Sequence, residues 1–211
     1  AKKIEANTLD AKFKTVVPLL GSSDVAQELR RKIKVVGSNT FPVLIYSQPR
    51  CGESLIAKMI HEISELNHLP FIYINCAHLN LNNIHQIFSV SNTNDDFFNG
   101  GTLFLDRIND LDLTLQDAFL ANYNDLKNIL STTENHQLRL LSCATENLSI
   151  KCKKLQFSPD LYDTLNAGHV LSCPALYERQ ADIRDFVNFY MTQAATRFGK
   201  NVKTIDCETL V

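Results

Sequence analysis

The chain has 211 residues, a formal net charge of −2, 45% hydrophobic residues and 21% charged residues. These values are typical of a globular protein with one sizeable core, and they exclude a wholly disordered chain. The longest apolar runs are too short to span a bilayer, and a near-neutral charge is not that of a nucleic-acid binder. No signal segment opens the chain, so we expect a cytoplasmic piece of a longer protein without membrane contact.

Residues 1–20 are mixed and weakly periodic, which predicts an N-terminal arm or linker. Residues 22–24 offer helix caps, and the apolar spacing after them predicts a helix that ends at Gly37. The apolar positions of this helix are Val25, Leu29, Ile33 and Val36. The short apolar run 43–46 predicts a buried strand, which a turn connects to a helix that begins near Gly52.

The alternation of strands and helices continues along the chain. Further strands are predicted at 71–75, 102–106, 138–143 and 170–172, and helices at 81–88, 113–130 and 181–198. The polar stretch 89–99 and the basic residues 151–154 are predicted to be exposed loops. This order predicts an α/β fold with a parallel five-stranded sheet covered on both faces. In such sheets ligands bind beyond the carboxyl ends of the strands, where residues 47–53 and Asp106 are expected.

The turn after the first strand nearly matches a phosphate-binding loop. A P-loop has the pattern G-x-x-x-x-G-K-[ST] between a strand and a helix, and the corresponding window here is 47–54. Gly52 and Ser54 match the pattern. Ser47 replaces the first glycine, and Glu53 occupies the lysine position.

The exchange of lysine for glutamate reverses a charge that ATP requires. The lysine attracts the β- and γ-phosphates, and unit charges about 4 Å apart interact by roughly 4 kcal/mol at an effective dielectric near 20. We therefore expect weak or absent ATP binding. Two alternatives stay open: Arg50 turns inward and compensates in part, or Glu53 is simply an exposed first-turn acid that the helix dipole favours.

From Gly21 onward the chain resembles the AAA+ central domain of sigma-54-dependent, NtrC-type bacterial enhancer-binding proteins. The similar segments are 21–23 with 27–30, 71–77, 100–106 with Leu111 and Gln116, 160–162 with Leu165 and Asn166, and 173–179 with Asp182 and Ile183. The resemblance implies an AAA+ P-loop three-layer sandwich over residues 21–175. Residues 176–211 would then begin a small helical lid.

The chain also departs from the family pattern. Asp106 stands where the resemblance implies a magnesium-associated aspartate, but Arg107 replaces the glutamate that polarises the attacking water. Ser158 and Thr164 replace arginines that reach a neighbouring subunit's nucleotide, and the interval 89–99 lacks the G-A-F-T-G-A motif that contacts sigma-54. Together these changes predict a degenerate domain that keeps the fold but neither hydrolyses ATP nor engages sigma-54.

The resulting interpretation is a regulatory domain of a transcription regulator that acts through self-association or ligand binding. Its expected partners are RNA polymerase and, through a module outside this chain, DNA. Some family members bind cyclic dinucleotides on this domain, and Arg50, Arg107 and Arg179 are the cations we expect to contact such an anionic ligand. Two alternatives remain: an atypical but active ATPase in which Arg50 replaces the lysine, and a scaffold or anti-activator of an active relative.

No catalytic residue, resident cofactor or metal site is predicted. The six histidines are scattered over different elements, and the six cysteines form no C-x-x-C pair. We expect the cysteines to be reduced and mostly buried.

Overall fold

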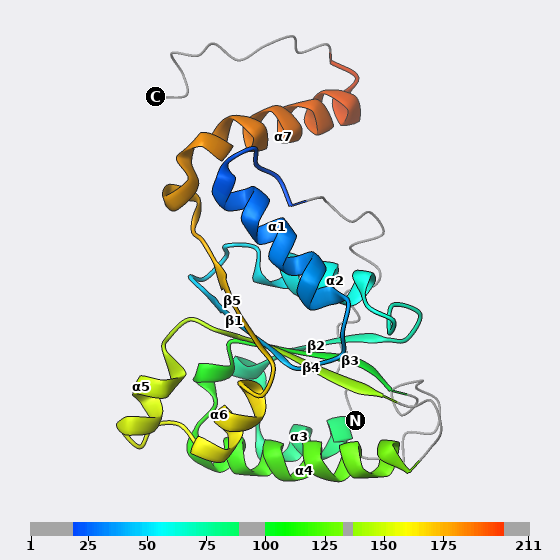
Figure 1. Ribbon diagram of the computed structural model, residues 1–211, viewed down its shortest axis with the longest axis vertical. Coiled ribbons are helices and arrows are strands. Elements are labelled where there is room, and N and C mark those ends of the chain that lie inside the picture. Colours follow the sequence, from blue (N-terminus) through cyan, green and yellow to red (C-terminus); the bar gives the residue numbers. More distant parts are fainter. Residues whose placement is uncertain (1–18, 89–99, 133–136, 201–211) are drawn as a thin grey trace.

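The computed structural model describes residues 19–88, 100–132 and 137–200 (Figure 1). Its centre is a five-stranded sheet with the strand order β2-β3-β4-β1-β5, in which every neighbouring pair is parallel. The strands are β1 (Val43–Ser47), β2 (Phe71–Asn75), β3 (Gly101–Asp106), β4 (Leu138–Ala144) and β5 (His169–Cys173). The predicted parallel five-stranded sheet is therefore confirmed.

Helices cover both faces of the sheet, which gives the three layers that were expected (Figure 1). On one face lie α1 (Asp24–Gly37) and α2 (Glu53–Ile63); on the other lie α3 (Leu81–Phe88), α4 (Leu113–Ser131), α5 (Leu148–Lys153) and α6 (Pro159–Leu165). Alternate residues of a strand supply the two cores: Phe104 packs toward α1 and α2, whereas Leu103 and Leu105 pack toward α3–α6. Because helices cover both faces, β3 is buried along its whole length, and β1 and β4 are buried at all but one position each.

The predicted inward face of the first helix needs a correction at one position. Leu29, Ile33 and Val36 are buried as expected, but Val25 is 43% exposed and Ala26 is buried in its place. The side chain of Ser23 accepts a hydrogen bond from the Ala26 N–H and thereby fixes where the helix begins. This start sets the rotation of the helix and turns Val25 outward.

Two short helices, α5 and α6, were not predicted. The basic residues Lys151 and Lys153 were expected in a loop, but they belong to the last turn of α5. The helix dipole stabilises positive charge at this end of a helix. The side chains of Asn147 and Ser158 cap the starts of these two helices. Such caps outweigh the weak periodicity of segments this short.

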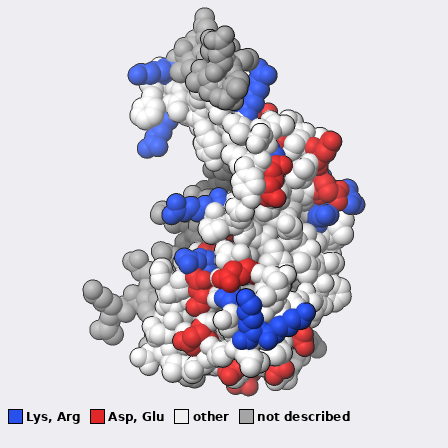
Figure 2. All heavy atoms as spheres, turned by 90° about the vertical axis from the view of Figure 1, so that its left-hand side faces the viewer, with Lys and Arg blue, Asp and Glu red and all other residues white. Residues whose placement is uncertain are grey.

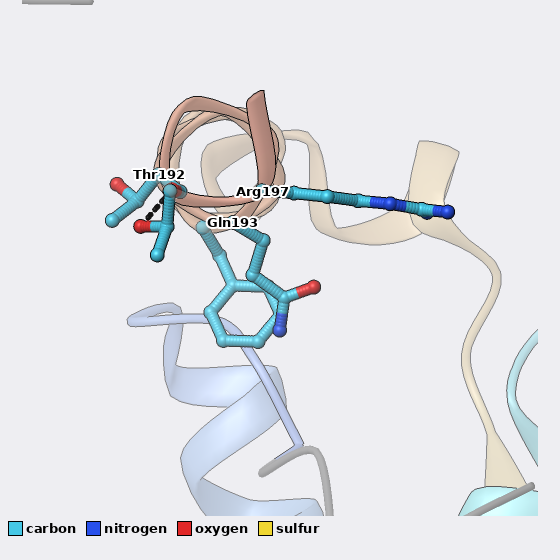
Figure 3. A pocket seen from close by; sticks show the side chains of 5 residues that line it. Thr192, Gln193 and Arg197 are labelled. Atoms are coloured by element: carbon cyan, nitrogen blue, oxygen red, sulfur yellow. Dashed lines mark hydrogen bonds between the residues drawn. The ribbon is translucent and has the colours of Figure 1, made fainter. Parts of the chain in front are cut away.

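After β5 the chain forms the 3₁₀ helix η5 (Leu176–Asp182) and then α7 (Ile183–Phe198), which extends beyond the sheet past the start of α1 (Figure 1). The predicted helix 181–198 corresponds to the end of η5 and to α7, which has no buried residue; Tyr190, for example, is 56% exposed. A shallow depression on α7 is lined by Phe189, Thr192, Gln193, Thr196 and Arg197 (Figure 3). Because one helix supplies this whole lining, the depression does not enclose a ligand site.

No helix in the described ranges 19–88, 100–132 and 137–200 is long and apolar enough to cross a membrane. The predicted division into an arm (1–20), a body (21–175) and a lid (176–211) stays a prediction. Residues 1–18 and 201–211 lie outside the described residues.

A buried carboxylate joins the loop before α1 to the start of α7. Asp182 accepts hydrogen bonds from the Ser23 backbone N–H at 2.7 Å and from the Ser23 hydroxyl at 2.8 Å. Its Oδ2 also lies 3.9 Å from Nη1 of the buried Arg179. Gly21 adopts φ 127°, and a Cβ there would lie 2.4 Å from Cγ of Asp182, so the contact requires glycine.

Replacing Asp182 with alanine is expected to lower the free energy of unfolding by about 2–3 kcal/mol. The change removes the acceptor of two hydrogen bonds and leaves the buried guanidinium of Arg179 without its carboxylate. Urea denaturation followed by circular dichroism measures this loss. Asp185→Ala on the half-buried first turn of α7 is the matched control, with an expected loss below about 1 kcal/mol. Equal losses in the two variants would contradict a specific role for Asp182.

Candidate functional site

The predicted site residues converge at the carboxyl edge of the sheet. β1 ends at Ser47 and β3 ends at Asp106, and β4 lies between these strands and pairs with both. Cys143 of β4 is level with Ile45, and the preceding residue of β4 is level with Leu105. Because the strands are parallel, the loop 47–53 and Asp106 both lie beyond this edge, as was expected.

The loop 47–53 contacts its surroundings on several sides. Ser47, at the position of the first glycine, is buried, and its Oγ lies 3.2 Å from Sγ of Cys143. The thiol of Cys173 donates to the carbonyl oxygen of Cys51 at 3.3 Å. Gln48 is exposed, and its Nε2 donates to the hydroxyl of Tyr177 in η5. These contacts hold the loop against β4, β5 and η5.

The side chain of Glu53 folds back onto the loop that precedes it. Its Oε2 accepts a hydrogen bond from the Gly52 N–H at 3.0 Å, and its Oε1 accepts one from the Arg50 N–H at 3.2 Å. A phosphate in a P-loop is held by backbone N–H groups of this kind, and Pro49 has none to offer. A nucleoside triphosphate therefore does not fit the loop in this conformation, because its negatively charged phosphates would have to displace a negatively charged carboxylate from these N–H groups.

Asp106 is a buried acid with one satisfied oxygen. The hydroxyl of Tyr73 donates to Oδ2 at 2.7 Å, whereas Oδ1 is buried and has no hydrogen-bond partner. Burial raises the pKa of Asp106, and the negative charge of Glu53 adds to that rise. Burial also raises the pKa of the Tyr73 hydroxyl. The carboxylates of Glu53 and Asp106 are thus close enough to repel each other.

A magnesium ion would satisfy the open oxygen of Asp106, but the site supplies no further set of ligands. Within residues 19–88, 100–132 and 137–200, no three histidine, cysteine, aspartate or glutamate side chains form a group that could hold a metal ion. Protein magnesium sites usually combine one or two carboxylates with water and substrate phosphates. Without a bound triphosphate, the residues present do not fit this ion.

The raised pKa of Asp106 predicts a pH-dependent stability. A raised pKa means that the folded state binds the proton more tightly than the unfolded chain, so ionisation of Asp106 opposes folding. This contribution is fully present below the ordinary pKa of an aspartate and is lost as the pH rises through the raised value. Asp106→Asn is therefore expected to raise the unfolding midpoint at pH 7 by roughly 2 °C, and the gain should shrink on acidification.

Thermal unfolding followed by circular dichroism between pH 4 and pH 8 checks this expectation. Asp117→Asn, at an exposed position of α4, removes the same charge without a buried carboxyl and should show no such trend. A gain for Asp106→Asn that grows toward low pH would contradict the assigned direction of the pKa.

The three arginines that were expected to contact an anionic ligand have different surroundings. Arg50 is exposed on the loop. Arg107 directly follows Asp106, adopts a left-handed φ of 58° and places Nη2 2.5 Å from Oδ2 of Asp110. Arg179 is buried, donates to the Leu20 carbonyl oxygen at 3.4 Å and lies over the Phe186 ring. Arg179 therefore supports the start of α7 instead of facing solvent.

Charges of both signs are interspersed on the face shown in Figure 2, which is the left-hand side of Figure 1. The mixture agrees with the small net charge of −2. This face does not have the broad basic surface that nucleic-acid binding requires.

Two further polar side chains belong to the site and were not predicted from the sequence. Tyr73 holds Asp106, as described above. Asn109 links the carboxyl ends of β3 and β4, because its Oδ1 accepts from the Thr145 N–H at 2.8 Å and from the Thr145 hydroxyl at 3.3 Å. No short motif reveals these contacts, because their partners are 33 and 36 residues apart in the sequence.

The residues at the expected arginine positions have local structural roles. The Ser158 side chain caps α6 by accepting from the Leu161 N–H, and the Thr164 hydroxyl donates to the Asp160 carbonyl oxygen. The interval 89–99, where the sigma-54-contacting motif was expected and not found, lies outside the described residues. The described cysteines are free; Cys76, Cys143 and Cys173 are buried, and Cys51 and Cys152 are half-buried.

Comparison with known proteins identifies relatives over most of the chain. A family profile described as "Sigma-54 interaction domain" matches residues 20–176. The chain is 32% identical to the transcriptional regulator VasH of Vibrio cholerae serotype O1 over 210 residues, which cover 90% of this chain and 39% of that protein. It is 31% identical to the anaerobic nitric oxide reductase transcription regulator NorR of Aeromonas salmonicida, covering 86% of this chain and 38% of that protein.

Solved structures show the same fold. The crystal structure of NtrX from Brucella abortus in complex with ATP superposes with a TM-score of 0.74 at 25% sequence identity, covering 90% of this chain and 44% of that one. The chain thus spans about two fifths of the length of each of these three relatives.

Proposed function

The chain belongs to the sigma-54 interaction domain family, and we propose that it is a regulatory AAA+ domain that works without turning over ATP. Its fold is also that of an ATP-bound relative. We therefore look for a difference in nucleotide handling in individual residues, and the residues at the carboxyl edge of the sheet support the proposal.

The observation that carries the proposal is the sign of the charges around the loop. Glu53 begins α2 where a triphosphate needs a cation, and its charge adds to the burial that raises the pKa of Asp106. The residue after Asp106 is Arg107, which is engaged with Asp110 and has no basic group that could accept a proton from water. A site with this arrangement both repels the substrate and lacks a general base.

Without turnover, the domain would act through its surfaces. We propose self-association, contact with RNA polymerase without engagement of sigma-54, and DNA binding through a part of the protein outside this chain. The small net charge and the mixed charges of the face in Figure 2 support placing DNA binding elsewhere. Two relatives that span far more sequence than this chain carry the name transcription regulator or transcriptional regulator, which supports the regulatory role.

A phosphate-release assay on the purified chain with ATP and magnesium, at concentrations that promote self-association, tests the central claim. We expect no release above that of the Asp106→Ala variant. Turnover that disappears in Asp106→Ala would instead establish an atypical ATPase, in which Arg50 serves in place of the lysine.

Calorimetry separates the remaining versions of the proposal. Heat on titration with cyclic di-GMP that is lost in Arg50→Ala would support ligand-gated control, since Arg50 is the exposed cation of the loop. Absence of heat with either cyclic di-GMP or ATP, together with concentration-dependent light scattering, would support regulation by self-association. Stable co-purification with an active relative, without self-association, would favour a scaffold or anti-activator.

A further inference from the structure

We propose that Glu53 is a built-in ligand of the degenerate loop: its carboxylate occupies the backbone donors that would otherwise hold a phosphate, and it closes the site from within. This inference deepens the proposed function, on which it rests, because it names what controls access to the same loop. Loss of a lysine alone would leave an empty anion site. A carboxylate bonded to the loop leaves an occupied one.

The two carboxylate oxygens of Glu53 accept hydrogen bonds from different donors. Oε2 accepts from the Gly52 N–H at 3.0 Å, and Oε1 accepts from the Arg50 N–H at 3.2 Å. Both donor residues have left-handed backbones, with φ 100° at Gly52 and φ 66° at Arg50. Successive N–H groups of such a turn point into one concavity that favours an anion.

The left-handed conformation of Arg50 supports the same conclusion. A residue with a Cβ is strained in this region, and strain persists only where surrounding contacts compensate for it. The described contact of the Arg50 backbone N–H is with Glu53, at the positive end of the α2 dipole. The carboxylate thus stabilises the loop geometry that bound phosphate stabilises in a P-loop.

Contacts elsewhere in the loop show that its closed form does not depend on a ligand. Gln48 is bonded to Tyr177 of η5, and the Cys51 carbonyl oxygen accepts from the thiol of Cys173. The loop is therefore anchored at its start and within the turn. We expect the loop to be ordered in the absence of any nucleotide.

Removal of the carboxylate should open an anion site. In Glu53→Ala, we expect amide hydrogen exchange at Arg50 and Gly52, measured by NMR, to accelerate about tenfold, because each N–H loses its acceptor. We also expect pyrophosphate, the probe, to bind at least tenfold more tightly than to the wild type. Glu53→Gln should fall between the two, because its amide oxygen still accepts one of the bonds without the charge.

Glu62→Ala is the matched control, since it removes an acid from the last turn of the same helix, away from the loop. It should change neither exchange at the two amides nor pyrophosphate binding. If Glu53→Ala fails to fold, Glu53→Gln provides the same two measurements.

Unchanged exchange at Arg50 and Gly52 in a folded Glu53 variant would overturn the proposal, even if pyrophosphate binding improves, because simple charge repulsion would then explain the gain. Faster exchange without improved pyrophosphate binding would also overturn it, because the vacated donors would not form an anion site. Failure of the proposed function has a different readout, namely phosphate release from ATP by the wild-type chain.

Discussion

Replacing Glu53 with lysine is expected to raise the affinity of the chain for ATP with magnesium at least a hundredfold. The substitution exchanges repulsion of the phosphates for attraction, each about 4 kcal/mol at 4 Å and an effective dielectric near 20. It also frees the Arg50 and Gly52 N–H groups that Glu53 occupies. A hundredfold gain corresponds to about 2.7 kcal/mol, which is less than the full electrostatic change. We expect the smaller value because Pro49 still lacks an N–H and Ser47 still replaces a glycine. Isothermal titration calorimetry measures the change.

The control for this prediction is Glu62→Lys, which changes the net charge equally but lies in the last turn of α2. Its effect on ATP affinity should be less than about threefold, since exposed charges more than a Debye length away are screened. Glu53→Lys alone should bind ATP without hydrolysing it, because Arg107 cannot polarise water. Unchanged affinity in a folded Glu53→Lys variant would mean that the loop, and not the charge, excludes the nucleotide.

Replacing Phe104 with alanine is expected to lower the free energy of unfolding by about 3–5 kcal/mol. Phe104 is fully buried in β3, a strand with neighbours on both sides, and its ring lies 6.1 Å from that of Phe71 and 5.9 Å from that of Tyr73. The loss combines the transfer of a large apolar side chain with the cavity that the surrounding core cannot fill. Urea denaturation followed by circular dichroism measures it.

Phe41→Ala provides the matched control, because it removes the same side chain from a position that is 61% exposed. Its expected cost is below about 1 kcal/mol. A similar cost for the two phenylalanines would show that burial in the sheet does not dominate the stability of this domain.

The regular elements could be predicted because hydrophobic periodicity is local information. The predicted strand 71–75 and the predicted helix 81–88 have the same bounds as β2 and α3. The helices α5 and α6 could not be recognised in this way, because elements of 6 and 7 residues show less than two turns of periodicity. The capping residues Asn147 and Ser158 were the sequence features that indicated where these two helices begin.

Burial of polar residues was the least predictable property. Arg139 in β4 is wholly buried and donates to the Val36 carbonyl oxygen at 2.8 Å and to the Phe41 carbonyl oxygen at 3.2 Å. Burial lowers the pKa of its guanidinium to about 10. An arginine within an apolar run is most often exposed, so its position follows only from the packing of the C-terminal end of α1 over the sheet.

The sequence by itself was enough to predict the parallel sheet, the family and the edge of the sheet at which residues 47–53 and Asp106 meet. Hydrophobic periodicity, the alternation of strands and helices and the order of motifs can all be read from the sequence. Only the tertiary structure decided what those residues do to one another. In the folded chain the Glu53 carboxylate accepts hydrogen bonds from the loop, and the Tyr73 hydroxyl donates to Asp106. Arg179 is buried against Phe186 of α7. The physical reason is that hydrogen bonds and pKa shifts depend on distances of a few ångströms. Sequence patterns do not give the side-chain conformation that brings Glu53 to donors one and three residues away, nor the contact of Tyr73 with Asp106 across 33 residues.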